Sequence, residues 1–184
     1  MKMNEKIIFA ALFSALAFCA CQSDLETTYN AQETRIDSYI SSNRVVGEDT
    51  LRVVYNGGSN RLVVTEGQGE ELSASGTVSF YYAGYVFNGS LSNSSLFATN
   101  HEDTAAAANW NLEGQDFTPV TINMAETKKT LLQGLANGLI GMKGGEEAEI
   151  LFSGKYGFGN KAYGNIPAKS ALAYKIWVVA VSNE

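Results

Sequence analysis

A run of apolar residues near the start of the chain is distinct from everything that follows. Residues 7–20 are almost all apolar and come after two lysines, at positions 2 and 6. The run is short for a membrane-spanning helix, and a basic start followed by a short apolar stretch is typical of a secretory signal peptide. We therefore predict that residues 1–20 are a signal peptide and lie outside the folded domain.

The spacing of apolar residues then changes from helical to strand-like. Between residues 27 and 42, four residues fall near one stripe of a 3.6-residue period, which predicts a short helix: Tyr29, Ile36, Tyr39 and Ile40. From residue 51 onward, short β-branched and aromatic runs bounded by Gly and Asn predict strands. The expected strands span residues 51–55, 61–65, 77–87, 120–124, 147–152 and 172–181.

One short helix is expected among these strands. Four leucines between residues 131 and 139 recur at helical spacing, and two glycines follow at 144 and 145, as is usual after a helix. Residues 90–117 are mostly small or polar and are expected to form a long surface excursion. The pattern predicts an α+β fold in which an antiparallel, curved β-sheet wraps one short helix. The expected divisions are a signal peptide at 1–20, a lipidated linker with a short helix at 21–50 and the folded domain at 51–184.

Composition and charge narrow the classes of function. The chain is 45% hydrophobic and 17% charged, which is typical of a globular protein, and its formal net charge is −6. We expect no nucleic-acid partner because no basic face for phosphate is visible. His101, the only histidine, has no Cys or His at ligand spacing, so no metal site is predicted. No phosphate-binding glycine loop is present either, and no cofactor is expected.

Two cysteines end the apolar run. Ala20 precedes Cys21, whereas the bulky Phe18 precedes Cys19. A small residue before a cysteine resembles the lipobox of bacterial lipoproteins, which are cleaved before a cysteine that carries lipid. The resemblance implies a lipid on Cys21 and a protein anchored in a membrane of the cell envelope, namely the outer membrane, at its periplasmic face or at the cell surface. An ordinary signal peptide with incidental cysteines is the alternative, because the lipobox usually has a smaller residue than Phe18.

Four motifs follow one another in the second part of the chain. They read FYYAG, GLANGLIGMKGGE, YGFG and NIPAKSALAY, and they span residues 80–84, 134–146, 156–159 and 165–174. In this order they resemble the strand, helix-and-turn, Tyr-Ala-Tyr-Gly and Ile-Ile-Pro-Pro motifs of FKBP-type peptidyl-prolyl cis-trans isomerases. The resemblance covers about residues 61–181. It implies an FKBP-like fold and an enzyme that isomerises prolyl bonds.

The resemblance also implies a hydrophobic cup as the site. Rotation about a prolyl bond faces a barrier of roughly 18–20 kcal/mol from amide resonance, and lowering it needs no acid, base, nucleophile or metal. A dry, aromatic-lined cup can favour the twisted amide over the planar one. Carried over position by position, the cup consists of Tyr82, Phe97, Leu131, Leu132, Leu135, Phe158, Ile166 and Tyr174. The backbone N–H of Leu132 is then the donor that anchors a substrate carbonyl.

Three positions depart from the family's pattern. The acidic residue that follows the family's Phe is Ala98, or Asn93 if residues 92–95 are aligned instead. The family's second Tyr is Phe158, and a Trp common at the pocket floor is Leu135. Apolar lining is kept while polar groups are lost, so weak catalysis is expected.

Three functions stay open from the sequence. The first is an isomerase that assists the folding of exported proteins, with proline-containing segments of those proteins as partners. The second is a non-catalytic FKBP-like lipoprotein that binds peptides or acts as a chaperone. The third is a surface lipoprotein for glycan binding or nutrient uptake, in which Trp110 and the tyrosines stack on sugars. Without the resemblance, Tyr82, Leu131, Leu132 and Tyr174 would be interpreted as ordinary core.

Overall fold

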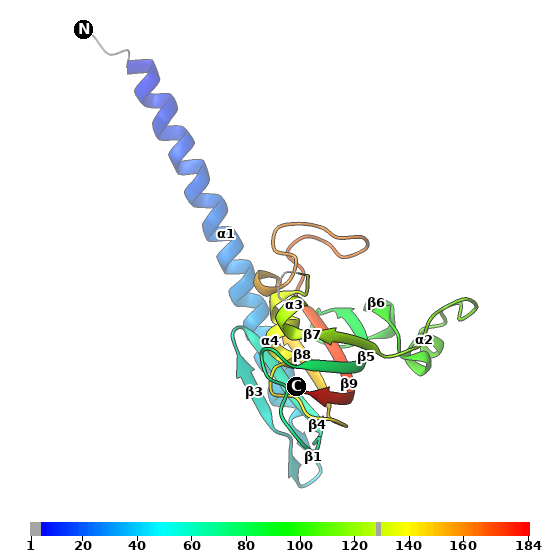
Figure 1. Ribbon diagram of the computed structural model, residues 1–184. Helices are drawn as coiled ribbons and strands as arrows, with labels where there is room; N and C mark the ends of the chain where they lie inside the picture. Colours follow the sequence, from blue (N-terminus) through cyan, green and yellow to red (C-terminus); the bar gives the residue numbers. More distant parts are fainter. Residues whose placement is uncertain (1–4, 128–129) are drawn as a thin grey trace.

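The computed structural model describes residues 5–127 and 130–184, with side chains from residue 24 onward except that of Thr127. A long N-terminal helix extends from a domain that is mostly β-sheet (Figure 1). The helices are α1 (Glu5–Asn43), α2 (Glu102–Ala107), α3 (Met124–Thr127) and α4 (Gln133–Leu139), with 3-10 turns η1 (Asn93–Ser95) and η2 (Gly154–Tyr156). The strands are β1 (Val45–Val46), β2 (Asp49–Thr50), β3 (Val53–Asn56), β4 (Ser59–Thr65), β5 (Thr77–Val86), β6 (Leu96–Thr99), β7 (Val120–Asn123), β8 (Glu147–Phe152) and β9 (Leu172–Ser182).

The main sheet is antiparallel and has the strand order β3-β4-β8-β9-β5-β6. Strand β7 also pairs with β5, so β6 and β7 share one edge of that strand: β6 pairs with residues 83–85 and β7 with residues 77–80. Register shifts interrupt β5 at two places along these pairings. Such bulges bend and twist a strand, and here they help to curve the sheet.

Helix α4 packs on the concave face of the curved sheet. Leu135 and Leu139 lie in the main core together with Ile150 of β8 and Ile176 of β9. Gly134 permits the close approach, because a Cβ at this position would lie within 2.6 Å of three ring carbons of Phe152. A glycine in the first turn of this helix therefore serves packing against the sheet.

A buried ion pair fixes the other end of α4. The Nη1 atom of Arg61 donates to the carbonyl oxygens of Gly138 (2.7 Å) and Ile140 (2.9 Å), and its Nε lies 3.3 Å from Oε1 of Glu146. Both side chains of the pair are almost fully buried. Because the last carbonyls of a helix lack partners within the helix, Arg61 satisfies groups that would otherwise lie buried without a donor.

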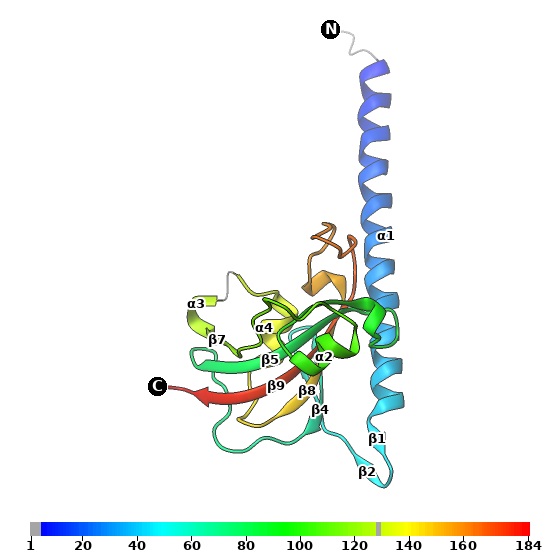
Figure 2. The ribbon, with the colours of Figure 1, turned by 90° about the vertical axis from the view of Figure 1, so that its right-hand side faces the viewer.

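Helix α1 packs against the opposite face of the same strands. Ile36 and Ile40 are buried against Leu151 of β8 and Ala173 of β9, the neighbours of core residues in sequence. Side chains alternate between the two faces of a strand, so α1 and α4 lie on opposite sides of β8 and β9. Figure 2 shows α1 running alongside the sheet, with the β1–β2 hairpin below it.

The structure confirms the predicted α+β class, in which a curved antiparallel sheet wraps a short helix. The helix expected at 27–42 is part of the longer α1, and the 90–117 excursion contains η1, β6 and α2. The proposed signal peptide and the lipid on Cys21 concern residues 1–21, whose side chains lie outside the described part, so both stay predictions. Among the helices described, none is both long and apolar enough to cross a membrane.

Candidate functional site

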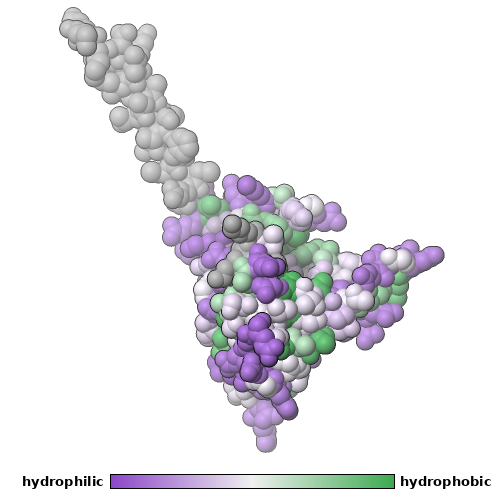
Figure 3. Space-filling model, viewed as in Figure 1, coloured by the Kyte–Doolittle hydropathy of each residue, from purple (hydrophilic) through white to green (hydrophobic). Residues whose placement is uncertain are grey.

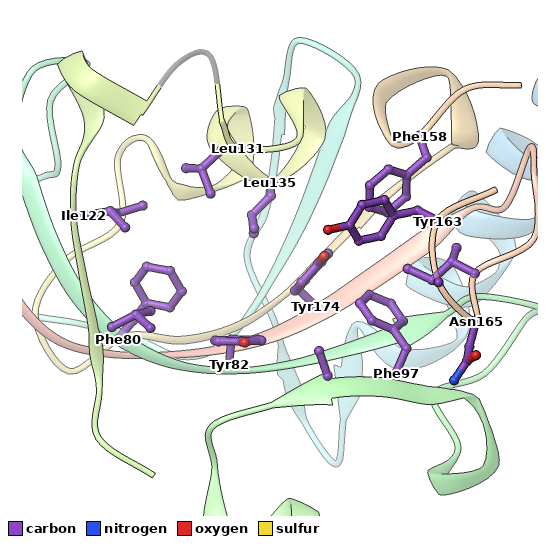
Figure 4. Close-up of a pocket in the computed structure, with 14 residues that line it drawn as sticks. Phe80, Tyr82, Phe97, Ile122, Leu131, Leu135, Phe158, Tyr163, Asn165 and Tyr174 are labelled. Carbon is purple, nitrogen blue, oxygen red and sulfur yellow. The ribbon is translucent and has the colours of Figure 1, made fainter. Parts of the chain in front are cut away.

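A cavity of about 570 Å³ lies between the concave face of the sheet, α4 and the segment that follows η2. Its lining is almost entirely aromatic or aliphatic and comes from widely separated parts of the chain (Figure 4). The residues are Phe80, Tyr82, Phe97, Ala98, Val120, Ile122, Leu131, Leu135, Phe158, Tyr163, Gly164, Asn165, Ile166 and Tyr174. In Figure 3 polar residues cover the tip of the lower hairpin, and hydrophobic residues gather in the middle of the domain's face.

Strands β5, β6 and β9 provide the aromatic wall. Tyr82 on β5 and Phe97 on β6 lie beside Tyr174 on β9, which pairs with Gly84. A Cβ at position 84 would lie 2.7 Å from Cζ of Phe97 and 3.0 Å from Cε1 of Tyr174. The glycine therefore makes room for two of the rings that form the cavity.

Tyr174 is the central ring of this wall. It stacks on Phe152 with a centroid distance of 6.0 Å, meets Phe97 edge-on at 5.8 Å and lies 6.4 Å from Tyr82. Burial raises the pKa of its hydroxyl above the usual value, with a smaller contribution from Tyr82. The hydroxyl is therefore protonated at neutral pH and can donate a hydrogen bond.

The segment after η2 forms the third side of the cavity. The ring of Phe158 stacks on that of Tyr163 at 4.7 Å and 6° between planes, and Tyr163 is 65% exposed. Tyr163 and Ile166 exchange two backbone hydrogen bonds of 3.0 and 2.9 Å, which close the turn between them. Figure 4 shows Phe158 and Tyr163 on one side, with Leu131 and Leu135 on the helical side.

The structure brings together seven of the eight residues assigned to the cup from the sequence. These are Tyr82, Phe97, Leu131, Leu135, Phe158, Ile166 and Tyr174. Leu132 does not line the cavity: it is the N-cap residue of α4, and its side chain packs against the main core. Among the described residues, none accepts a hydrogen bond from the Leu132 N–H, so its predicted role as an anchoring donor stays a prediction.

The structure places the two candidates for the family's acidic position in different surroundings. Ala98 lines the cavity next to Phe97, whereas the side chain of Asn93 donates to the carbonyl oxygen of Ala107, at the end of α2, at 2.8 Å. Trp110, considered for sugar stacking, packs partly buried against a cluster that includes Tyr85.

Seven lining residues were not assigned to the cup from the sequence. One is Ala98, which was named only as a departure from the family's pattern. The others are Phe80, Val120, Ile122, Tyr163, Gly164 and Asn165. Phe80 could have been found, because it lies two residues before Tyr82 on β5 and so shares its face. The loop residues at 163–165 carry no periodic signal that marks them.

The chemistry available in the cavity is limited to apolar contact and neutral hydrogen bonding. Its polar side-chain groups are the tyrosine hydroxyls and the amide of Asn165, and the lining contains no carboxylate, amine or imidazole. In the part of the chain described here, no cluster of His, Cys, Asp or Glu could hold a metal ion. Such a lining can hold an apolar ring away from water and donate a few hydrogen bonds to carbonyl groups beside that ring.

Comparisons with known proteins agree with this fold. Residues 68–179 match the model of the family described as FKBP-type peptidyl-prolyl cis-trans isomerase. The sequence is 23% identical over 125 residues to FK506-binding protein 1 of Aspergillus oryzae, covering 68% of this chain and 99% of that protein. The family match extends over more than half of the chain, which therefore belongs to the FKBP-type peptidyl-prolyl cis-trans isomerase family.

Two solved structures show the same fold. FkpA from Escherichia coli aligns with a TM-score of 0.54 and 19% identity, over 98% of this chain and 74% of that one. A peptidyl-prolyl cis-trans isomerase from Pseudomonas syringae aligns with a TM-score of 0.55 and 18% identity, over 86% of this chain and 96% of that one. The FKBP-like fold expected from the sequence motifs is thus confirmed.

Proposed function

We propose that this protein is a peptidyl-prolyl cis-trans isomerase that assists the folding of exported proteins by acting on their proline-containing segments. The observation that carries the proposal is the cavity of about 570 Å³, which is lined by aromatic and aliphatic side chains and contains no ionisable group other than tyrosines. Prolyl isomerisation is a reaction that such a cavity can catalyse, because it needs neither a proton transfer nor a nucleophile.

Catalysis in this cavity arises from its low polarity. A planar amide has more charge separation than a twisted one, so removal from water disfavours the planar ground state more than the transition state. The proline ring would lie among Tyr82, Phe97 and Tyr174, above Leu135. The N–H of Leu132, at the start of α4, would hold a substrate carbonyl and keep the prolyl bond in place.

The hydroxyls of the lining tyrosines supply the remaining hydrogen bonds. Tyr82 and Tyr174 offer donors on the strand side, and Tyr163 offers one at the rim. Ala98 and Phe158 contribute only apolar surface where the family pattern has a carboxylate and a hydroxyl. We therefore expect activity that is real but weak.

A protease-coupled assay on an Ala-Leu-Pro peptide tests the proposal. The cis-to-trans conversion should be faster than the uncatalysed reaction, which takes on the order of tens of seconds at 25 °C. Tyr82→Ala should lower kcat/KM, whereas Tyr55→Ala, a matched change at an exposed tyrosine outside the cavity, should leave it unchanged. A rate equal to the buffer control with folded protein would refute the proposal.

A non-catalytic peptide-binding or chaperone module is the second candidate function. The observation that favours it is that two lining positions, Ala98 and Phe158, lack the polar groups of the family pattern. This candidate predicts that the protein binds proline-containing peptides or suppresses client aggregation without accelerating isomerisation. Calorimetric titration with the assay peptide, next to the rate measurement, separates the two functions.

We further propose that the protein is anchored to the cell envelope through a lipid on Cys21. The support is the basic and apolar stretch at 1–20, which ends in Ala20 before Cys21. Metabolic labelling with a fatty-acid analogue should mark the wild-type chain and Cys19→Ser but not Cys21→Ser. Labelling of the Cys21→Ser variant at the wild-type level would contradict the anchor.

A further inference from the structure

Helix α1 places one buried polar side chain against the segment that forms the third side of the cavity. Gln32 is 7% exposed, although it belongs to a helix whose other face is polar. Its Nε2 donates to the carbonyl oxygen of Lys169 at 2.5 Å, and its Oε1 accepts the N–H of Gly154 at 2.8 Å. A single amide group thus bridges two backbone groups that are fifteen residues apart in the sequence.

These two backbone groups are the two ends of the cavity segment, which we define as residues 154–169. The N–H of Gly159 donates to the carbonyl of Gly154 (2.9 Å), and the N–H of Lys169 donates to the carbonyl of Gly159 (2.7 Å). Phe158, Tyr163 and Ile166 project from between these ends into the cavity. The base of the segment is therefore closed by its own hydrogen bonds together with those of Gln32.

The backbone of Lys169 adopts a conformation that needs support from its surroundings. Its φ is +62°, in the left-handed region that residues with a Cβ seldom adopt. Such a conformation persists where the surroundings hold it in place. Among the side chains described, that of Gln32 is the one that binds the Lys169 carbonyl.

The register of α1 on the sheet determines where the amide lies. Ile36, one helical turn after Gln32, is fully buried against β8 and β9, and Ile40 follows one turn later. Tyr39 adds a 2.8 Å hydrogen bond from its hydroxyl to Oε2 of Glu149 on β8. A helix that lies outside the 68–179 region shared with the family is thus docked so that Gln32 reaches the cavity segment.

We infer that Gln32 is a positioning residue for the cavity, which fixes the wall formed by Phe158, Tyr163 and Ile166 by holding both ends of the segment. The inference rests on the proposed function insofar as the cavity is the peptide site. It assigns to α1 a role in peptide affinity in addition to any role as a linker. A purely structural role would instead stabilise the whole domain and leave the cavity segment no more mobile than the rest.

The isosteric change Gln32→Glu in the full chain provides a pH-dependent test. At pH 8 the carboxylate still accepts the N–H of Gly154 but cannot donate to Lys169, and it repels that carbonyl oxygen. Below the pKa of the new carboxyl, which burial raises above about 4.3, the protonated group donates again. Thr34→Glu, at an exposed position on the same helix, is the matched control for the added charge.

Two readouts are compared with wild type at the same pH. At pH 8, hydrogen exchange of Gln32→Glu should be faster at residues 154–169 than elsewhere, and affinity for the Ala-Leu-Pro peptide should fall about fivefold, as expected for one lost hydrogen bond. Both changes should reverse at pH 4, below the pKa of the new carboxyl, and Thr34→Glu should show neither. Uniformly faster exchange, or a loss that persists at pH 4, would overturn the inference.

Hydrogen exchange also separates this inference from the proposed function. If wild type neither binds nor isomerises the peptide, the proposed function fails, while selective exchange at 154–169 would still support the role of Gln32 in holding the segment. If Gln32→Glu does not fold at pH 8, Gln32→Asn replaces it. Its amide is one methylene too short to reach both partners, so the same selective exchange is expected, and its absence would refute the inference.

Discussion

Replacing Gly134 with alanine should destabilise this protein, although the same change in most helices is stabilising. Gly134 lies in the first turn of α4 and faces Phe152, which is fully buried. An alanine Cβ would lie within 2.6 Å of the Cγ, Cδ1 and Cδ2 atoms of that ring. Carbon atoms pack at about 3.5–4.0 Å, so the helix and the ring must separate by roughly 1 Å.

The magnitude follows from two opposing contributions. Alanine gains at most about 1 kcal/mol of helix propensity over glycine. Overpacking a well-packed core costs about 1–3 kcal/mol, and three contacts with a fully buried ring place this site at the upper end. We expect a net loss of about 1–2 kcal/mol in the free energy of unfolding, and a fall in Tm of about 2–8 °C for a chain of this length.

Thermal and urea unfolding measure this change, and a second readout connects it to the cavity. Phe152 stacks on Tyr174, so a displaced ring should disturb the aromatic wall and lower isomerase activity as well. Gly144→Ala is the matched control, because the nearest atom to its new Cβ is 3.7 Å away. A rise in Tm for Gly134→Ala, or equal effects of the two variants, would refute the packing argument.

Three further changes test the site and the core. The double change Ala98→Asp with Phe158→Tyr should raise kcat/KM about tenfold or more, because it adds two hydrogen bonds of about 1 kcal/mol each. An unchanged rate in the protease-coupled assay would contradict the explanation that catalysis is weak because these polar groups are lost. Tyr163→Ala removes a ring that stacks on Phe158, so calorimetry should show peptide affinity falling about fivefold, a loss on the order of 1 kcal/mol, with little change in urea unfolding because Tyr163 is exposed. Burial raises the pKa of Glu146, with Arg61 opposing the shift, so its contribution to stability is full below its unfolded pKa of about 4.3 and is lost as pH rises through the higher folded value. The free energy of unfolding of Glu146→Gln, measured with urea, should therefore rise relative to that of wild type between pH 4 and pH 7. A difference that stays constant with pH would contradict this assignment.

Most of the regular elements could be predicted from the sequence, because the spacing of apolar residues follows the period of the helix or strand that buries them. Strand β5 was expected at 77–87 and spans Thr77–Val86, and the helix expected from the leucines at 131–139 is α4, which spans Gln133–Leu139. Strand β6 was not predicted: it has only four residues and lies in a polar stretch, and it is stabilised mainly by pairing with the edge of β5. Short edge strands carry little pattern of their own.

Positions in the cavity were predictable where a motif or a period set the direction of the side chain. Leu131 and Leu135 line the cavity, but Leu132 does not: both Leu131 and Leu132 precede α4, and Leu132 is its non-helical N-cap residue, so the helical period expected from the leucines does not set its direction. Tyr163 lies in an aperiodic turn, so its place beside Phe158 depends on tertiary contacts. Gln32 lies one helical turn before Ile36, on the buried side of α1, but a single polar residue in an apolar stripe does not show which backbone groups its amide will bind.

The order in which the strands occur in sequence has a consequence for how the domain folds. Strand β9 follows all the other strands of the sheet in sequence, yet it lies between β8 and β5 in the middle of the sheet. During synthesis, which proceeds from the N-terminus, β9 is the last strand to be made. Before it is made, the edges of β8 and β5 that pair with it are open, and Tyr174 is not there to complete the aromatic wall. The many contacts between distant residues favour slow folding, so the nascent chain itself passes through an interval in which it is prone to aggregate.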